Sequence, residues 1–143
     1  MILRRDLLVG ALAAASAAAP LSAALPSAAR TSQSPFACDR LALTPALRHR
    51  HFDELGPFLR TKIIAAHEQA DGYVFRFPND WNTLASLTEW VNGERYCCPF
   101  FDIDIAVGRE HGELSMRLSG RPGTKDFIRS DFAPWFAKAG ARK

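Results

Sequence analysis

Two short segments of strict alternation in the second half of the chain constrain the fold most. Apolar residues occupy every second position over residues 101–107, and the pattern recurs over residues 114–118. A period of two is typical of strands with one buried face and one wet face. With a turn over residues 109–112, the register pairs Ile105 with Met116, Ile103 with Leu118, and Asp104 with Arg117. Side-chain parity and charge agree in this register, so we expect an antiparallel hairpin.

Residues 44–77 predict two helices and one strand. Apolar side chains recur at helical intervals over residues 44–70, and Gly56-Pro57 interrupts the run because proline cannot continue a helix without losing a hydrogen bond. We therefore expect a helix, a break and a second helix. Asp71-Gly72 predicts a turn, and the aromatic alternation over residues 73–77 predicts a strand that ends at Pro78.

Two further helical regions complete the expected fold. Asn79 or Asp80 is suited to cap a helix that runs to about Cys98, where the following proline stops it. Residues 124–139 are helical in pattern but contain Pro134, which predicts a kink or two short helices. The expected order is α-β-α-β-β-α, a small, mainly antiparallel three-stranded sheet in an α+β domain with the helices packed on one face.

The first residues are typical of a processing segment and are set aside from the fold. Arg4 and Arg5 precede an alanine-rich apolar run that is too short to span a bilayer stably, and small residues near Ala29 offer a cleavage site. The pattern resembles a twin-arginine signal peptide, which implies recognition by the export machinery and a periplasmic or otherwise exported protein. An ordinary secretory signal, an uncleaved anchor or a lipoprotein attached through Cys38 are the alternatives.

This interpretation sets the organisation of the chain. We expect a signal peptide over residues 1–29, a flexible leader over residues 30–43 and a single α+β domain over residues 44–143, with no stable membrane span after cleavage. Cleavage after residue 29 lowers the formal net charge from +3 to +2, because the paired arginines and one aspartate are removed. So small a surplus argues against nucleic acid as a partner, since such domains carry clustered basic residues.

The chain has three cysteines, and Cys97 and Cys98 are adjacent. A disulfide between these neighbours would be strained, because their Cα atoms are about 3.8 Å apart and ordinary disulfides span about 4.4–6.8 Å. Cys38 is the less strained disulfide partner. An odd number of cysteines in an exported protein leaves one thiol free or gives the cysteines a role other than cross-linking.

The surroundings of the pair argue against a strongly activated nucleophile. Both cysteines lie at the expected C-terminal end of a helix, where the dipole raises the pKa of a thiol, although Arg95 could offset this effect. No flanking histidine forms a recognisable Cys-His signature, so the sequence favours a non-enzymatic domain over an enzyme. His49 and His51 are two residues apart and would lie on nearly opposite sides of a helix, which prevents shared ligation.

Glu94 falls on the core-facing side of the same helix, one turn before Cys98. A buried carboxylate needs a partner or a raised pKa. Glu94 could accept a hydrogen bond, lean out to solvent, or join the thiols as a ligand. Cysteine thiolates suit a thiophilic ion such as Cu(I), Zn(II) or a heavier metal or metalloid, with Glu94 or a histidine completing the shell, although the usual C-x-x-C spacing is absent.

Three functional hypotheses follow. The first is metal or metalloid binding through Cys97 and Cys98, with Glu94 as an accessory ligand. The second is thiol redox or sensing, in which Cys38 exchanges disulfide states with Cys97 or Cys98. The third is an interaction module with packed cysteines, which offers its aromatic C-terminal helix to a partner.

The loop over residues 120–125 precedes the last expected helix. Its sequence favours a plain turn and helix cap over an anion-binding site.

Several of these residues also carry a resemblance. The segments Asp71-Gly72-Tyr73, residues 94–100 and residues 118–127 together resemble a group of small bacterial proteins of unassigned function, marked by E-R-x-C-C-P-F and L-x-G-x-x-G-x-K-x-F. The match covers about residues 41–129. The resemblance implies that Glu94, Arg95, Cys97, Cys98 and Pro99 act as one unit, and it carries no catalytic assignment. The group is associated with chains that lack a signal sequence, so the leader is a departure.

Overall fold

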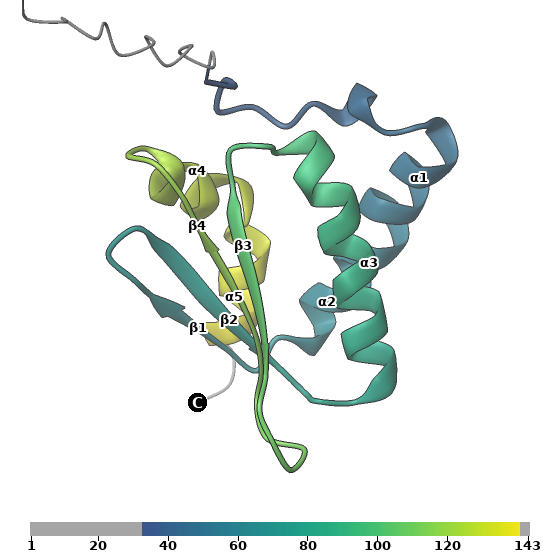
Figure 1. Ribbon diagram of the computed structural model, residues 1–143, viewed down its shortest axis with the longest axis vertical. Helices are drawn as coiled ribbons and strands as arrows, with labels where there is room; N and C mark the ends of the chain where they lie inside the picture. Colours follow the sequence, from purple (N-terminus) through teal and green to yellow (C-terminus); the bar gives the residue numbers. More distant parts are fainter. Residues whose placement is uncertain (1–32, 141–143) are drawn as a thin grey trace, which may run out of the picture. The chain divides into compact units, whose positions relative to one another are not determined.

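A computed structural model describes residues 33–140, which form an α+β domain around an antiparallel sheet (Figure 1). The helical elements are η1 (Arg40–Ala42), α1 (Pro45–His49), η2 (Arg50–Leu55), α2 (Gly56–Lys62), α3 (Trp81–Cys97), α4 (Thr124–Asp131) and α5 (Ala133–Gly140). The strands are β1 (Ala65–Glu68), β2 (Gly72–Phe77), β3 (Asp102–Val107) and β4 (Leu114–Ser119), in the order β1-β2-β4-β3. The signal peptide expected over residues 1–29, with Arg4 and Arg5, lies outside the described residues.

The hairpin of β3 and β4 has the register that its alternation predicts. Ile105 pairs with Met116, Ile103 with Leu118, and Asp104 with Arg117, so the predicted pairing is confirmed. The connecting turn contains Glu110 and His111 with φ of 56° and 59°. Arg117 bonds to the carboxylates of Asp104 and Asp71 on the wet face of the sheet, at 3.1 and 2.8 Å.

The sheet has four strands, and the expectation of three is wrong. The additional strand is β1, which pairs with β2 in a register that sets Ala65 opposite Arg76 and Glu68 opposite Tyr73. The sequence of β1 has little strand character, so its pairing with β2 and not its own propensity determines its conformation. A Cβ at Gly72 would overlap the carbonyl oxygen of Leu118, so glycine is what lets the start of β2 approach β4 closely.

One face of the sheet forms the core. Tyr73, Phe75 and Phe77 of β2 are buried together with Leu114, Met116 and Leu118 of β4, and they pack against apolar side chains of the helices. The prediction of a kink or two short helices over residues 124–139 is confirmed, because α4 ends at Asp131 and α5 begins with Pro134 in its first turn. The third hypothesis offers the aromatic C-terminal helix to a partner, and two aromatic residues of that region, Phe132 and Trp135, are buried in this core.

The helical run from α1 to α2 continues through Gly56-Pro57, so the predicted break there is wrong. Between them, η2 is a π-helical turn in which the Gly56 amide donates to the carbonyl of His51, five residues earlier. A π-turn widens the helix and shifts the phase of the side chains that follow. Pro57 then occupies the first turn of α2, where its missing amide hydrogen is tolerated.

The described part of the expected leader, from Gln33 to Leu43, contacts the domain. The Asp39 amide donates to the carbonyl of Cys97 at 2.7 Å, and the Phe36 ring meets the edge of Phe100. Across residues 33–140, no helix combines the length and the apolar character that a membrane span requires.

Candidate metal centre

Helix α3 positions two of the candidate residues. The Asp80 side chain caps the helix by accepting a hydrogen bond from the Thr83 amide at 2.9 Å. The buried residues of α3 recur every three or four positions: Thr83, Leu87, Trp90, Glu94 and Cys97. Glu94 and Cys97 are therefore on the core-facing side of the last turn, as the expected helical phase placed Glu94.

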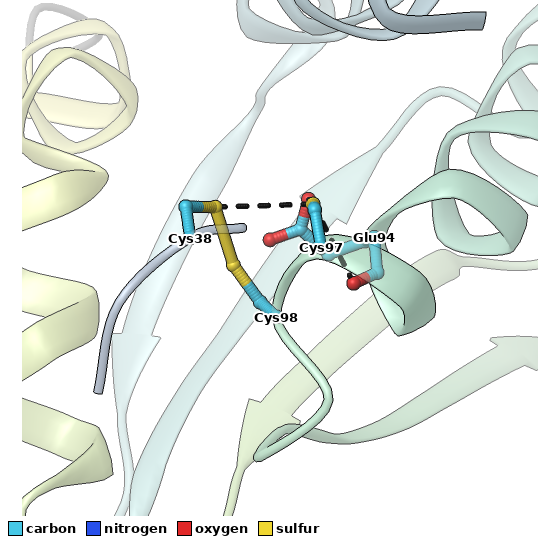
Figure 2. A group of neighbouring side chains, drawn as sticks. All are labelled: Cys38, Glu94, Cys97 and Cys98. Carbon is cyan, nitrogen blue, oxygen red and sulfur yellow. Dashed lines mark hydrogen bonds between the residues drawn. A yellow bond between two sulfur atoms is a disulfide. The ribbon is translucent and has the colours of Figure 1, made fainter. Parts of the chain in front are cut away.

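Cys98 ends the helix and forms a disulfide with Cys38, whose Cα lies 5.0 Å from that of Cys98 (Figure 2). Cys38 lies in the segment that precedes η1, next to Asp39, whose amide donates to the Cys97 carbonyl at the end of α3. The adjacent cysteines thus differ in chemistry: Cys98 is oxidised and Cys97 is a free, buried thiol.

The Cys97 residue is completely buried, in a small cluster with Cys98 and Phe100. Its Sγ lies 3.4 Å from Glu94 Oε2 and 3.8 Å from Cys38 Sγ. Figure 2 draws these side chains together at the end of α3. Burial raises the pKa of the Cys97 thiol far above its ordinary value, and the neighbouring Glu94 carboxylate raises this pKa further. The thiol is therefore protonated at neutral pH unless a cation compensates the charge of its thiolate.

Four residues in the described part of the chain bring their ligand atoms together here. The Sγ atoms of Cys38, Cys97 and Cys98 and a carboxylate oxygen of Glu94 all lie within 4.8 Å of one another. Sulfur donors favour soft and borderline metals, and a carboxylate contributes a negatively charged oxygen. The structure thus brings together the three residues predicted as ligands, Glu94, Cys97 and Cys98, and adds Cys38.

His51 is the residue that sequence reasoning missed. Its Nε2 is hydrogen-bonded to Glu94 Oε2 at 2.8 Å and lies 3.9 Å from Cys97 Sγ. Each of the His51 and Glu94 side chains is only 3% exposed. The imidazole stacks on Trp90 at 5.3 Å between ring centroids and meets the edge of Phe52. The rings on its two sides fix the orientation of the imidazole.

A helical phase argument could not find His51, because the π-turn alters the phase at that residue and its partner is 43 positions away. The signal that pointed to it was Glu94. A carboxylate on the core side of a helix requires a hydrogen-bonding or charged partner, and a histidine is one of the side chains that can provide it.

The remaining sequence candidates lie away from this cluster. Arg95 is exposed, donates to Asn92 and lies over the Tyr96 ring at 4.6 Å, so its charge does not offset the surroundings of Cys97. His49 is exposed and forms a hydrogen bond with Asp53. In the loop over residues 120–125, Arg121 bonds to the Ser34 carbonyl and lies over Phe36.

A cavity of about 190 Å³ adjoins the cluster. Cys38, His51 and Glu94 contribute to its wall, and aromatic rings from three elements form much of the remainder: Phe52, Trp90, Phe132 and Trp135. Arg60 and Asp131 also line it, and the Asp131 carboxyl is partly shielded from water there. Desolvation raises the pKa of Asp131, an effect that the charge of Arg40 opposes. The cluster is therefore reached from a cavity, although the Cys97 sulfur itself is covered.

No protein-family model, curated protein or solved structure matches this chain.

Proposed function

We propose that the protein is an exported, non-enzymatic domain that binds a thiophilic metal ion or metalloid at Cys38, Glu94, Cys97 and Cys98. The observation that carries this proposal is the convergence of three sulfurs and a carboxylate oxygen within 4.8 Å. Glu94 and Cys97 are buried, and a buried carboxylate or thiolate is costly unless an opposite charge or a hydrogen bond compensates it. A bound cation would neutralise the carboxylate and the thiolates together.

The spacing of the sulfurs supports this proposal. Two sulfurs bound to one tetrahedral zinc at about 2.3 Å each are about 3.8 Å apart. Cys97 Sγ and Cys38 Sγ are separated by 3.8 Å. Reduction of the Cys38–Cys98 disulfide is needed before those two cysteines become ligands, because a disulfide sulfur is a poor donor compared with a thiolate. The full set of three thiols therefore belongs to the reduced protein.

Thiol redox chemistry is the second candidate, because the Cys38–Cys98 disulfide has a free thiol beside it. Exchange requires the attacking sulfur to approach along the axis of the disulfide. With Cys97 Sγ 3.8 Å from Cys38 Sγ, an axial approach would place the Cys97 and Cys98 sulfurs about 5.9 Å apart, given a disulfide bond of about 2.05 Å. These two sulfurs are within 4.8 Å. Cys97 lies to the side of the bond, which favours shared ligation over exchange.

A metal titration of the reduced mature protein tests the proposal. We expect Cd²⁺ to produce sulfur-to-metal charge-transfer absorption and a mass increase of a single ion under native conditions. Cys97→Ser and Cys98→Ser should each weaken binding by at least about tenfold. Glu94→Gln should weaken it too, whereas Glu89→Gln, an exposed residue of the same helix, is the matched control. Unchanged Cd²⁺ content in both cysteine variants would overturn the proposal.

The redox candidate is tested by mass mapping after oxidant and reductant treatment. A sensor predicts that a bridge from Cys38 moves between Cys98 and Cys97. A single Cys38–Cys98 bridge that only opens and closes would be consistent with metal binding and would exclude exchange through Cys97.

Export rests on the residues before the described domain. We propose recognition by the twin-arginine machinery and cleavage near Ala29, supported by the arginine pair and the weak apolar run that follows it. Replacing Arg4 and Arg5 with lysine should retain the precursor in the cytoplasm. Continued export of this variant would show that an ordinary secretory route operates.

A further inference from the structure

One set of potential metal ligands remains available while the Cys38–Cys98 disulfide is closed. His51 Nε2, Glu94 Oε2 and Cys97 Sγ take no part in the Cys38–Cys98 bond, and they form a compact triangle with sides of 2.8, 3.4 and 3.9 Å. Each comes from a buried side chain. The set combines an imidazole nitrogen, a carboxylate oxygen and a single sulfur.

The triangle has nearly the dimensions of three ligands on one tetrahedral ion. Zinc binds nitrogen at about 2.05 Å, oxygen at about 2.1 Å and sulfur at about 2.3 Å. Tetrahedral angles then separate nitrogen from oxygen by about 3.4 Å, and sulfur from either of them by about 3.6 Å. The largest departure is the Nε2–Oε2 distance, which is the length of a hydrogen bond. An ion inserted between these two atoms would replace that bond and open the distance by about 0.6 Å.

We infer that the protein with its Cys38–Cys98 disulfide closed binds a borderline divalent cation of the zinc class through His51, Glu94 and Cys97, and leaves a fourth coordination position for a small exogenous ligand. This inference rests on the proposed function in sharing Cys97 and Glu94 as ligands. It differs from the proposed function because His51 takes the place of Cys38 and Cys98 as a ligand. It also requires the disulfide to be closed, whereas the set of three thiols requires it to be reduced.

The cavity supports the open position. Both His51 and Glu94 line the cavity of about 190 Å³, so an ion held between their donor atoms lies at its wall. Three protein ligands with a fourth position open to a cavity are the arrangement found in catalytic zinc sites, whereas structural sites have four protein ligands. Water or a small anion fits that position, and the cavity wall carries charges of both signs, from Arg60 and Asp131.

The redox state of the exported protein determines which donor set is present. An oxidising compartment keeps Cys38 and Cys98 paired, which leaves the single sulfur of Cys97. One sulfur with nitrogen and oxygen donors suits zinc or cobalt, and additional thiolates shift the preference toward softer ions. The disulfide thus selects between two ligand sets that share Cys97 and Glu94.

The packing around His51 orients its Nε2 toward the other donors. A Cβ at Gly93 would lie 2.6 Å from His51 Nδ1, so only glycine at this position of α3 leaves space for the ring. Trp90 stacks on one face of the imidazole. A histidine held in one orientation loses little conformational entropy when it binds a metal, which favours binding.

Cobalt spectroscopy on the non-reduced mature protein tests the inference. The intact disulfide is first verified by mass, and Co²⁺ is then added without reductant. We expect the intense visible bands of tetrahedral Co²⁺, a sulfur-to-cobalt charge-transfer band, and loss of both when Zn²⁺ is added. Azide should shift the visible bands, because it enters the fourth position. Weak octahedral bands without a sulfur band in the wild-type protein would overturn the inference.

Variants locate the site. His51→Asn should lower Co²⁺ affinity at least about 100-fold, since removing even an outer-shell partner costs about 10–100-fold. His67→Asn, an exposed histidine of β1, is the matched control. Cys97→Ser should abolish the charge-transfer band, a readout that does not depend on the folding of the His51 variant. Unchanged Co²⁺ spectra in both His51→Asn and Cys97→Ser would contradict the inference.

The two proposals fail separately. If the non-reduced protein gives no tetrahedral Co²⁺ site but the reduced protein binds Cd²⁺ through its cysteines, the inference is wrong and the proposed function stands. If Co²⁺ binds through His51 but Cys98→Ser leaves Cd²⁺ binding unchanged, the three-thiol set of the proposed function is wrong and the inference stands.

Discussion

Reducing the Cys38–Cys98 disulfide should destabilise the domain by an amount that its position in the chain determines. The two cysteines are 60 residues apart in sequence. Closing a loop of that length removes about 14 cal/mol/K of entropy from the unfolded chain, which is about 4 kcal/mol at 25 °C. Measured disulfides contribute about 2–4 kcal/mol in most proteins, so this value is at the upper end.

The assay is urea unfolding of the mature protein, followed by far-UV circular dichroism with and without a phosphine reductant. The Cys97→Ser variant is the suitable background, because only the Cys38–Cys98 bridge can form within it. We expect the free energy of unfolding to fall by about 3–4 kcal/mol on reduction. The m-value should rise, since the reduced unfolded chain is less compact and exposes more surface.

Two controls separate this effect from others. A Cys38→Ala, Cys98→Ala double replacement in the same background should unfold identically with and without reductant. A loss on reduction of less than about 1 kcal/mol would refute the reasoning. It would mean that Cys38 is not linked to the end of α3, and that the N-terminal segment does not belong to the candidate site.

Three other predictions concern the core and the cluster. Gly93→Ala should displace His51, because the new methyl would lie 2.6 Å from Nδ1; overpacking of about 1–3 kcal/mol, partly offset by about 1 kcal/mol of helix propensity, should lower stability in urea and weaken Co²⁺ binding. Gly140→Ala, with open space around it at the end of α5, should leave Co²⁺ binding unchanged and should not lower stability. Because the pKa of the Cys97 thiol is raised in the folded protein, the metal-free protein should keep its full stability below the pKa of the unfolded thiol, about 8.5, and lose stability as the pH rises above that value. A urea midpoint that does not change with pH over this range would contradict the prediction. Leu118→Ala should lower the free energy of unfolding by about 2–5 kcal/mol, because the side chain is completely buried between the sheet and the helices. A loss below about 1 kcal/mol would contradict the placement of the core on this face of the sheet.

The hairpin shows what the sequence alone could predict. The pairing of Ile105 with Met116 follows from a local pattern of period two, a short turn and complementary charges, and all three lie within 20 residues of one another. The capping of α3 by Asp80 is equally local. Features whose cause lies within a few residues are visible in one sequence.

Strand β1 shows why the number of strands was wrong. Its residues, Ala65–Glu68, have weak strand propensity, and the apolar spacing before them continues a helical pattern. The available signal was Asp71-Gly72, since such a dipeptide before an alternating strand predicts a hairpin with a strand on its other side. Pairing with β2 overrides the local preference of β1.

The candidate site was predicted in part for a similar reason. Glu94, Cys97 and Cys98 were visible because they lie close together in one helix, and the burial of Glu94 follows from its helical phase. The contribution of His51 depends on a π-turn and on a tertiary contact with Glu94, and neither has a local signature. The choice of Cys98 over Cys97 as the partner of Cys38 is also a tertiary property.

X-ray absorption at the zinc edge of the zinc-loaded mature protein tests the central claim most directly, that a metal is bound around Cys97 and Glu94. The non-reduced protein should show one sulfur at about 2.3 Å, together with nitrogen and oxygen at about 2.0–2.1 Å. Reduction should add sulfur neighbours as Cys38 and Cys98 become thiolates. A first shell of nitrogen and oxygen alone in both states would contradict the account.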